Sequence, residues 1–288
     1  MNRKLSRNIR YATITVVKNE QDTIVNTMNS IVTQTLKPNR IVVVDDGSTD
    51  KTPRYLKWYR DNVGDDRGHR IVEIVTLPDR GFSVTGSPLM AKNYNAGLDR
   101  LWGNPDWDYL VIVAGDTVIP PNYVKSLLDK MNQGDIKYGV ASGFTAMRRV
   151  ASTYATGSGR AIRRKILEEL NGYPEIYSWE TVPIIKAWQL GYKTGHFKDV
   201  AMKTRAIGGG RRKMKGWGRG MKDSGYYFPM VLYRLVSVAL LERHPIRAFW
   251  MAWGYFTYRY KKQYEWQHFH SNYQKQNIKS KVKRMFKR

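Results

Sequence analysis

The chain has 288 residues, 42% hydrophobic and 25% charged, which is enough apolar sequence to bury a core and excludes an intrinsically disordered protein. Its 49 lysines and arginines against 24 aspartates and glutamates give a formal charge of +25, which indicates a polyanionic partner: anionic lipid, nucleic acid or a phosphate-rich substrate. With no cysteine, disulfides, thiolate metal sites and cysteine nucleophiles are excluded. The basic N-terminus lacks the apolar core of a secretory signal, and no window has the ~20 uncharged apolar residues of a spanning helix, so neither is expected.

The first part of the chain alternates between strand and helix patterns. Strands are predicted at 13–17, 41–44, 71–75 and 109–113, and helices near 24–32, 51–59, 91–101 and 120–131. This alternation is typical of an α/β fold with a mainly parallel sheet and helices on both faces.

The pattern loosens after Gly139, with a strand predicted at 140–144 and helices at 163–170 and 181–190. Between Lys203 and Lys222 there are eight basic residues and no acid, and from Arg259 onward there are ten basic residues and one acid. We therefore expect an α/β domain over residues 1–205 and an extension over residues 206–288, made of a basic mobile loop, amphipathic helices and a basic tail.

Two acidic turns follow predicted strands. Four β-branched residues, 41–44, run into Asp45-Asp46-Gly47, and the strand at 109–113 runs into Gly115-Asp116. Ligands of open α/β sheets bind beyond the carboxyl ends of the strands, so these acids are candidate ligand contacts. A nucleotide diphosphate needs acceptors for its ring N–H or ribose hydroxyls, and carboxylates to hold a cation on its phosphates. Ordinary strand-to-helix turns with solvated acids are the alternative.

In order and spacing, the motifs over about residues 11–196 resemble glycosyltransferase family 2, the inverting, sugar-nucleotide-dependent enzymes of GT-A fold. The segment 16–20 resembles the first nucleotide-contacting turn of that family, 44–50 resembles the second, 91–93 resembles the helix against the donor, and 115–116 lies where the metal-binding Asp-x-Asp motif belongs. The resemblance implies a nucleotide-diphosphate sugar donor and a divalent cation, Mg²⁺ or Mn²⁺. Donor contacts would come from Val16, Asn19, Glu20, Asp45, Asp46, Lys92, Asn93, Gly115 and Asp116, with Asp46 at the nucleoside and Asp116 at the metal.

The chain departs from the family at Ala114, which replaces the first acid of Asp-x-Asp. One carboxylate suffices if phosphate oxygens and waters complete the shell of the cation. Alternatively, Asp116 only caps the following helix.

A base for the acceptor hydroxyl is the next requirement of inverting transfer. The resemblance assigns this role to Glu180, eleven residues before Gly191, and places Trp179 beside it as a wall for the acceptor sugar. The structural alternatives are that Glu180 is a helix N-terminal residue stabilised by the dipole and that Trp179 is a core aromatic.

The glycine-rich basic segment 208–220 is expected to be a mobile loop that closes over the substrate. Arg211, Arg212 and Arg219 would pair with the donor diphosphate or an acceptor phosphate, and Trp217 would contact the acceptor. A solvated linker has the same composition.

Two short apolar segments, 230–241 and 248–256, carry interfacial tryptophan and tyrosine with flanking basic residues. They are expected to lie on an anionic membrane surface, or else to pack on the first domain. The resulting hypothesis is an inverting glycosyltransferase in the cytoplasm, peripherally bound to the membrane, with a lipid-linked or glycan acceptor. A basic nucleic-acid-binding protein and an inactive nucleotide-sugar-binding relative are the alternatives; nucleic acid is not the expected partner, because it leaves the acidic turns unexplained.

Overall fold

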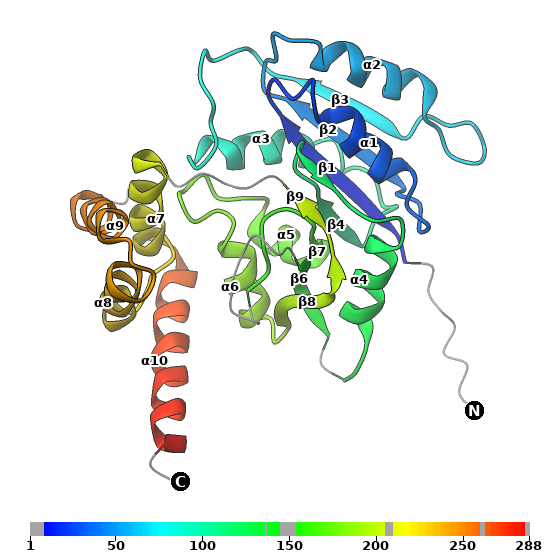
Figure 1. Cartoon of the computed structure of the whole chain (residues 1–288). Coiled ribbons are helices and arrows are strands. Elements are labelled where there is room, and N and C mark those ends of the chain that lie inside the picture. The colour runs from blue at the N-terminus through cyan, green and yellow to red at the C-terminus, as the bar shows by residue number, and fades with distance from the viewer. Residues whose placement is uncertain (1–8, 136, 145–153, 205–209, 260–262, 286–288) are drawn as a thin grey trace, which may run out of the picture. The chain divides into compact units, whose positions relative to one another are not determined.

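The structure is a computed structural model that describes residues 9–135, 137–144, 154–204, 210–259 and 263–285, with side chains described as far as residue 278 (Figure 1). Two features of the sequence predictions, the glycines at 208 and 209 and the end of the basic tail, lie outside the described residues.

The core is a seven-stranded sheet in the order β3-β2-β1-β4-β7-β6-β8. Its strands are β1 (Tyr11–Val17), β2 (Arg40–Asp45), β3 (Val72–Thr76), β4 (Tyr109–Ile112), β6 (Tyr138–Phe144), β7 (Arg160–Arg163) and β8 (Lys193–Ala201). Strands β1 to β4 are parallel neighbours, as is the pair β6 and β8, which confirms the predicted mainly parallel sheet. Strand β7 runs antiparallel between β4 and β6 and was not predicted. A separate antiparallel pair joins β5 (Thr117–Val118) to β9 (Lys203–Thr204).

Helices cover both faces of this sheet. On one face, α1 (Ile24–Val32), α2 (Thr52–Asn62) and α4 (Tyr123–Asn132) share one core cluster with inward residues of β1, β2 and β4. On the other face, α3 (Leu89–Leu98) approaches β1 and β2 closely, because a Cβ on Gly97 would lie 3.1 Å from side-chain atoms of Ile14 and Val44. The short helix α5 (Arg164–Leu170) follows β7.

Strand register brings four strand ends to one edge of the sheet. Val17 is opposite Asp45, and Asp45 is opposite Thr76, so β1, β2 and β3 end level with one another. On the other side of β1, Ile14 pairs with Ile112, and the Val113 N–H then donates to the Ile14 carbonyl at 3.2 Å. From β1 the sheet continues to β2 and β3 on one side and to β4 on the other. Such a switch in strand order is where α/β sheets form a crevice for ligands.

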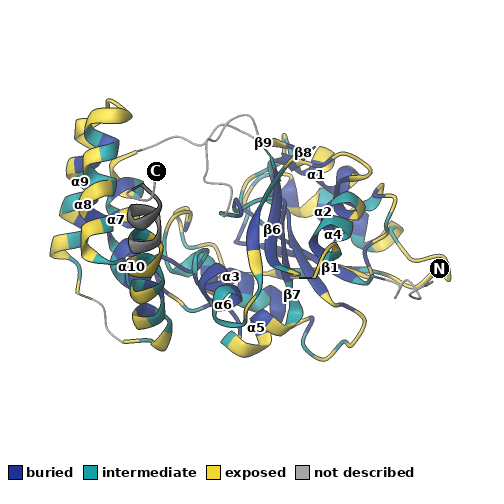
Figure 2. Cartoon of the chain, turned by 90° about the horizontal axis from the view of Figure 1, so that it is seen from below, coloured by how far each residue is buried: buried dark blue, intermediate teal, exposed yellow. Residues whose placement is uncertain are grey.

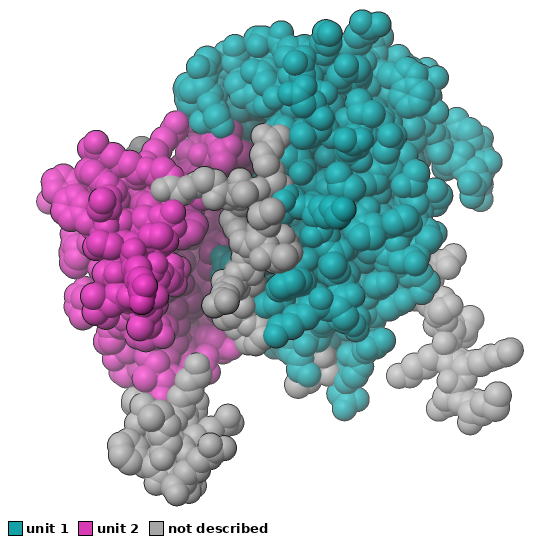
Figure 3. Space-filling model, viewed as in Figure 1, with its two compact units in different colours: residues 1–83, 92–173, 190–206 teal, residues 84–91, 174–189, 207–288 magenta. Residues whose placement is uncertain are grey.

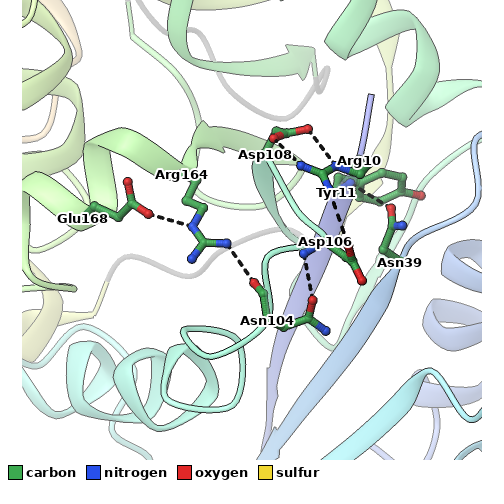
Figure 4. A network of polar contacts seen from close by, with 8 residues as sticks. All are labelled: Arg10, Tyr11, Asn39, Asn104, Asp106, Asp108, Arg164 and Glu168. Atoms are coloured by element: carbon green, nitrogen blue, oxygen red, sulfur yellow. Dashed lines mark hydrogen bonds and ion pairs between the residues drawn. The ribbon is translucent and has the colours of Figure 1, made fainter. Parts of the chain in front are cut away.

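The opposite edge of the same strands is closed by a polar network (Figure 4). The Arg10 guanidinium donates to both oxygens of Asp108, at 3.1 and 3.2 Å, and to Asp106 at 3.4 Å. Arg164 of α5 donates to the Asn104 carbonyl at 2.8 Å and to Glu168 at 2.7 Å. These contacts join the starts of β1, β4 and α5 away from the ligand edge.

The chain divides into two compact units (Figure 3). Unit 1 is residues 1–83, 92–173 and 190–206, and unit 2 is residues 84–91, 174–189 and 207–288. Unit 2 thus contains two internal segments, one of them holding Glu180, that the sequence analysis placed in the first domain.

Unit 2 is helical, with α6 (Val182–Gln189), α7 (Arg211–Asp223), α8 (Phe228–Val236), the π-helical turn η1 (Ser237–Leu241), α9 (Pro245–Thr257) and α10 (Glu265–Met285). The prediction of a mobile loop through residue 220 is wrong, because residues 211–223 form helix α7. One glycine of each helix serves close packing of α7 on α9: a Cβ on Gly218 of α7 would lie 1.9 Å from the Met251 carbonyl oxygen of α9, and one on Gly254 of α9 would lie 2.2 Å from the Lys215 carbonyl oxygen of α7. The backbones of α7 and α9 are therefore in direct contact at these glycines.

Helix α10 is anchored by His270, which is 3% exposed. Its Nδ1 lies 2.7 Å from the Ser224 carbonyl and its Nε2 lies 3.0 Å from the Gln274 amide nitrogen, so Nδ1 carries the proton and Nε2 accepts. Burial lowers the pKa of His270 to about 4. The neutral ring therefore holds α10 to the end of α7.

Replacing Gly218 by alanine tests the helix contact. Alanine normally stabilises a helix by about 1 kcal/mol over glycine, but here its Cβ would meet the Met251 backbone, so we expect the free energy of unfolding to fall by about 1–3 kcal/mol. The matched control is Gly220→Ala in the same helix, where the nearest atom would be 3.4 Å away and no loss is expected. Equal effects of the two substitutions in denaturant melts would contradict close packing at Gly218.

The buried His270 predicts a pH-dependent stability. Because its folded pKa is about 4 and its unfolded pKa is about 6.5, the unfolded state gains the proton first as the pH falls, and stability is lost between these two values. From about pH 7 to about pH 5 the loss is about 2 kcal/mol. In His270→Gln this part of the pH dependence should disappear, which thermal melts of both proteins at the two pH values measure. An equal loss of stability in wild type and variant would refute the role of His270.

Candidate active site

The turns after β1 and β2 are joined by reciprocal hydrogen bonds through Asn19. The Asn19 N–H donates to the Ser48 hydroxyl at 2.9 Å, and the Asn19 side-chain oxygen accepts from the Thr49 N–H at 2.8 Å. Asn19 has a φ of 53°, a left-handed conformation that asparagine tolerates better than most residues. These bonds hold the two predicted nucleotide-contacting turns in one fixed arrangement.

Further bonds extend this connection into α2. The Glu20 N–H donates to the Thr52 hydroxyl at 2.9 Å, and the Gln21 N–H donates to Asp50 at 3.0 Å. The other Asp50 oxygen accepts from the Thr52 N–H at 2.9 Å. Partial burial raises the pKa of Asp50, but the hydrogen bonds from Thr52 and Gln21 outweigh it and the pKa lies below its ordinary value.

The two consecutive acids have different surroundings. Asp45 accepts the Ser48 N–H at 2.9 Å and so closes its own turn. The Asp46 carboxylate, 2% exposed, forms an ion pair with Arg80. Between them and Ser48, Gly47 has a φ of 72°, and a Cβ there would lie 2.4 Å from the Asp79 backbone, so only glycine fits. Asp46 is therefore the acid whose partner is a side chain that a ligand can replace.

Sequence reasoning missed a set of charged residues from two turns. Lys18 donates to the carbonyls of Asp46 and Gly47, at 2.8 and 3.2 Å, and to the Asp79 carboxylate at 2.6 Å. This hydrogen bond from Lys18 holds the pKa of Asp79 below its ordinary value. Arg80 completes the group. The available signal was the acidic-basic pair Asp79-Arg80, a few residues beyond the third predicted strand and at the same sheet edge as Asp46.

The turn after β4 packs directly on the turn after β1. A Cβ on Gly115 would lie 2.7 Å from a methyl group of Val17 and 3.3 Å from Cγ of Glu20, so glycine is required for the approach. The Gly115 carbonyl lies 3.0 Å from the Thr23 hydroxyl, which also lies 2.7 Å from a Glu20 carboxylate oxygen. Glu20 and the Gly115-Asp116 turn are thus neighbours.

The turn after β4 is supported by Ser158 and Arg160, two residues that sequence reasoning also missed. The Ala114 N–H donates to the Ser158 hydroxyl at 3.0 Å, and that hydroxyl bonds Thr117 at 2.7 Å. The Ser158 segment is held by the fully buried Arg160 of β7, which donates to the carbonyls of Ala155 and Thr156 at 2.8 and 2.9 Å.

The donor set for a metal is small. Within the described parts of the chain there is no cluster of three metal-ligating side chains. Asp116 is half-buried in the turn after β4, and the Glu20 carboxylate belongs to the adjoining turn. This set fits a cation that takes most of its ligands from phosphate oxygens and water, as Mg²⁺ commonly does.

Three further donor candidates lie on β1 and α3. Val16 is the penultimate residue of β1 and is half-buried. Lys92 is exposed, whereas Asn93 is fully buried and neither of its amide atoms has a hydrogen-bond partner among the described residues. A buried amide without partners is costly, which marks Asn93 as a position where a ligand group would be favourable.

Glu180 belongs to unit 2, in the segment that leads into α6. It is half-buried, and Trp179 beside it is 7% exposed. The segment is held by α7, because the Tyr177 N–H donates to the Asp223 carboxylate at 2.8 Å. Burial raises the pKa of Asp223, against the opposing effect of the hydrogen bonds from Tyr177 and Tyr258.

The basic candidates of α7 differ in their contacts. Arg211 and Arg212 are exposed in its first turn, and the Arg211 guanidinium lies 4.0 Å from the centre of the Trp250 ring. Arg219 donates to the Tyr177 hydroxyl at 2.5 Å and lies over the Tyr177 and Tyr258 rings, so it contacts both the Glu180 segment and the end of α9. Trp217 is 45% exposed.

The structure therefore brings together the predicted donor residues of three turns, Asn19, Glu20, Asp45, Asp46, Gly115 and Asp116, and adds Lys18, Asp79 and Arg80 to them. The predicted base, the acceptor residues and the phosphate-binding arginines are all carried by unit 2.

Comparisons with known proteins agree with this fold. Mannosyltransferase PcManGT from Pyrobaculum calidifontis, solved with GDP-Man and Mn²⁺, is similar with a TM-score of 0.59 and 17% identity over 93% of this chain and 80% of that one. S. aureus TarS 1–349, solved in complex with UDP, is similar with a TM-score of 0.52 and 14% identity over 82% of this chain and 73% of that one. At these identities the likeness concerns the fold.

In sequence, the chain is similar to Glycosyltransferase GlyA of Streptococcus pneumoniae serotype 4, with 25% identity over 198 residues. The match covers 68% of this chain and 26% of that protein, so the chain spans about a quarter of the length of this relative. The sequence profile described as Glycosyl transferase family 2 matches residues 13–171, more than half of the chain and all four turns of the site. The chain belongs to glycosyltransferase family 2.

Proposed function

We propose that this protein is an inverting glycosyltransferase that moves a sugar from a nucleotide-diphosphate donor to a lipid-linked or glycan acceptor at a membrane surface. The observation that carries the proposal is the convergence of Asn19, Asp46, Arg80 and the Gly115-Asp116 turn at the carboxyl edge of β1 to β4. Family membership supports the same reaction.

The Asp46 and Arg80 pair favours a definite class of nucleobase. We place Asp46 opposite the ring nitrogen of the base and Arg80 opposite the neighbouring exocyclic group, so that the carboxylate accepts from a ring N–H and the guanidinium donates to a carbonyl. Uracil, thymine and guanine present that edge, whereas cytosine and adenine present a ring nitrogen acceptor next to an amino group. The donor is therefore a uridine, thymidine or guanosine diphosphate sugar, with Lys92 and Asn93 of α3 as further donor contacts.

At the diphosphate end, a divalent cation would be held by Asp116, with phosphate oxygens and water as its other ligands. When bound, such an ion neutralises charge on the leaving diphosphate. The first turn of α7 carries Arg211, Arg212 and Lys213 and no acid, a charge that opposes the helix dipole and favours a phosphate there.

For the transfer itself, Glu180 accepts the proton of the acceptor hydroxyl. The acceptor oxygen then bonds to the anomeric carbon as the bond from that carbon to the diphosphate breaks, with inversion. Trp179 and Trp217 are the proposed acceptor contacts. Arg219 acts here through Tyr177, which it binds, and so positions the Glu180 segment.

Membrane action is proposed from charge and surface. Residues 207–288 hold 19 basic and 3 acidic residues, which favours an anionic surface. Among the described helices, none is both long and apolar enough to cross a bilayer. Peripheral binding at the cytoplasmic face is therefore the proposed location.

A second candidate function follows from Ala114, which leaves a single acid at the metal turn. A relative that binds nucleotide sugars without transferring them would have the same donor residues, and an assay for transfer distinguishes the two.

The base assignment predicts a selective loss of turnover in Glu180→Gln. Without an ionised carboxylate to take the proton, transfer or donor hydrolysis should fall by about 10²–10⁴-fold, whereas nucleotide affinity stays within about twofold of wild type. Initial rates and calorimetric titration measure these two quantities. Glu175→Gln, an exposed acid of the same segment, is the matched control and should retain activity. An equal loss of nucleotide binding in Glu180→Gln would assign the residue a structural role.

The nucleobase assignment predicts a pattern in a thermal-shift screen of nucleoside diphosphates with Mn²⁺. UDP, dTDP or GDP should raise the melting temperature, whereas CDP and ADP should not, because their base edges oppose Asp46 and Arg80. Arg80→Ala should weaken binding of the best ligand by about tenfold through loss of a charged hydrogen bond. Arg54→Ala, an exposed arginine of α2, is the control. Tight binding of CDP would refute the assignment.

A further inference from the structure

An unpaired apolar face runs along the outside of α8, η1 and α9. Of the large hydrophobic side chains exposed in the described structure, eleven of fifteen lie between residues 217 and 256. Figure 2 shows exposed positions along these helices, whereas strands β1 and β6 of the sheet are almost entirely buried. We call the lipid face the following residues: Phe228, Leu232, Tyr233, Val236, Leu240, Leu241, Ile246, Phe249, Trp253 and Phe256.

The spacing shows that this exposure is not scattered. In α9, Ile246, Phe249, Trp253 and Phe256 recur at helical intervals on one side, while Ala248, Met251 and Gly254 are buried on the other. In α8, Phe228, Leu232 and Val236 lie four residues apart, and the buried residue is Val231. Each helix already uses one face for the core with Met214 and Met221 of α7, and the residues of the second apolar face remain 45–74% exposed.

The most exposed residues cluster where η1 turns into α9. Leu240, Leu241 and Ile246 are 70%, 74% and 73% exposed. The turn between them is ordered: the Glu242 N–H donates to the Ser237 carbonyl at 2.9 Å and the His244 N–H donates to the Val238 carbonyl at 3.0 Å. Leu240, Leu241 and Ile246 are thus exposed on a hydrogen-bonded turn, an arrangement suited to inserting aliphatic side chains into a lipid bilayer.

Charges around this turn complement an anionic surface. Arg243 and Arg247 flank the aliphatic residues, and the single acid of the turn, Glu242, is paired with Arg234 at 2.8 Å. Further along, Lys215 lies 4.7 Å from the centre of the Trp250 ring and 5.8 Å from that of Trp253, an arrangement of cation and indole typical of the headgroup region.

We propose that the lipid face docks on an anionic phospholipid bilayer, with Leu240, Leu241 and Ile246 inserted below the headgroups and Arg243 and Arg247 at the phosphates. A second copy of the chain is a poorer occupant, because 19 basic and 3 acidic residues in segment 207–288 would repel an identical partner. Nucleic acid would satisfy the cations but would leave the aliphatic side chains in water. An interfacial helix pair satisfies both sets of residues.

This inference deepens the membrane part of the proposed function, and vesicle binding without donor or acceptor tests it separately from transfer. Because the chain has no cysteine, Leu241→Cys provides one labelling site for an environment-sensitive fluorophore. On mixing with vesicles of phosphatidylcholine and phosphatidylglycerol, the label should shift to the blue. The same label on Trp58→Cys, an exposed site of α2, should not shift, and phosphatidylcholine alone should give a weaker response.

Flotation of unlabelled protein gives the affinity. Replacing Leu240, Leu241 and Ile246 together by serine should weaken vesicle binding tenfold or more, because each loses an apolar side chain that the bilayer would bury. The exposed pair Val25→Ser and Trp58→Ser, in unit 1, is the matched control and should bind as wild type does. Arg243→Gln with Arg247→Gln should reduce the difference in binding between about 0.1 M and about 1 M salt.

Two results would overturn the proposal. One is vesicle binding by the triple serine variant equal to that of wild type. The other is a fluorescence shift of the Leu241→Cys label that follows protein concentration without lipid, with a dimer in sedimentation, which would assign the face to a second copy. Donor hydrolysis in solution by the triple variant should match that of wild type, so a failure of lipid binding and a failure of the proposed chemistry are distinguishable.

Discussion

The site depends on the reciprocal bonding of Asn19 with Ser48 and Thr49. Sheet register alone brings the ends of β1 and β2 level, but a loop that follows a strand is free to diverge unless its own backbone groups are satisfied. Here one asparagine in a left-handed conformation satisfies groups of both turns, and Glu20 and Gln21 continue the connection into α2. Asp46 and the Glu20 carboxylate therefore share one rigid support, and the Gly115 turn packs against it.

Stability and ligand binding are divided between the two ends of the same strands. At the amino ends, Arg10, Asp108 and Arg164 join β1, β4 and α5 through exposed and half-buried contacts. At the carboxyl ends, Asp45 and Asp46 are buried, and Lys18 bonds both to the Asp46 carbonyl and to the Asp79 carboxylate. Because the strands are fixed at one end by this network and along their length by the core, the other end can hold charged groups at close quarters. Arg160 of the antiparallel strand β7 extends this support, through the Ser158 segment, to the turn after β4.

Local patterns predicted the strands β1 to β4, their helices and the acidic turns, because β-branched runs, helical spacing and turn glycines act over a few residues. They failed where the cause is distant in the chain. Arg80 meets Asp46 across 34 residues, so no window contains both. Glycines 216 to 220 suggested a mobile loop, yet the reason for Gly218 is the Met251 backbone of another helix. Strand β7 is short and contains a buried arginine, which hides it from any hydrophobic pattern.

The Arg80 and Asp46 pair has a consequence for selectivity. A nucleobase that uses this edge exchanges one satisfied hydrogen-bonding arrangement for another, so the net gain from the contact is small, about 1 kcal/mol. Under the proposed placement of the base, one with the opposite pattern would separate the carboxylate from the guanidinium without satisfying either group, and that penalty is several times larger. The proposed placement therefore discriminates by rejecting the wrong donor and adds little to the affinity for the right one. The nucleoside diphosphate left after transfer would then dissociate without breaking a tight contact to Asp46 and Arg80.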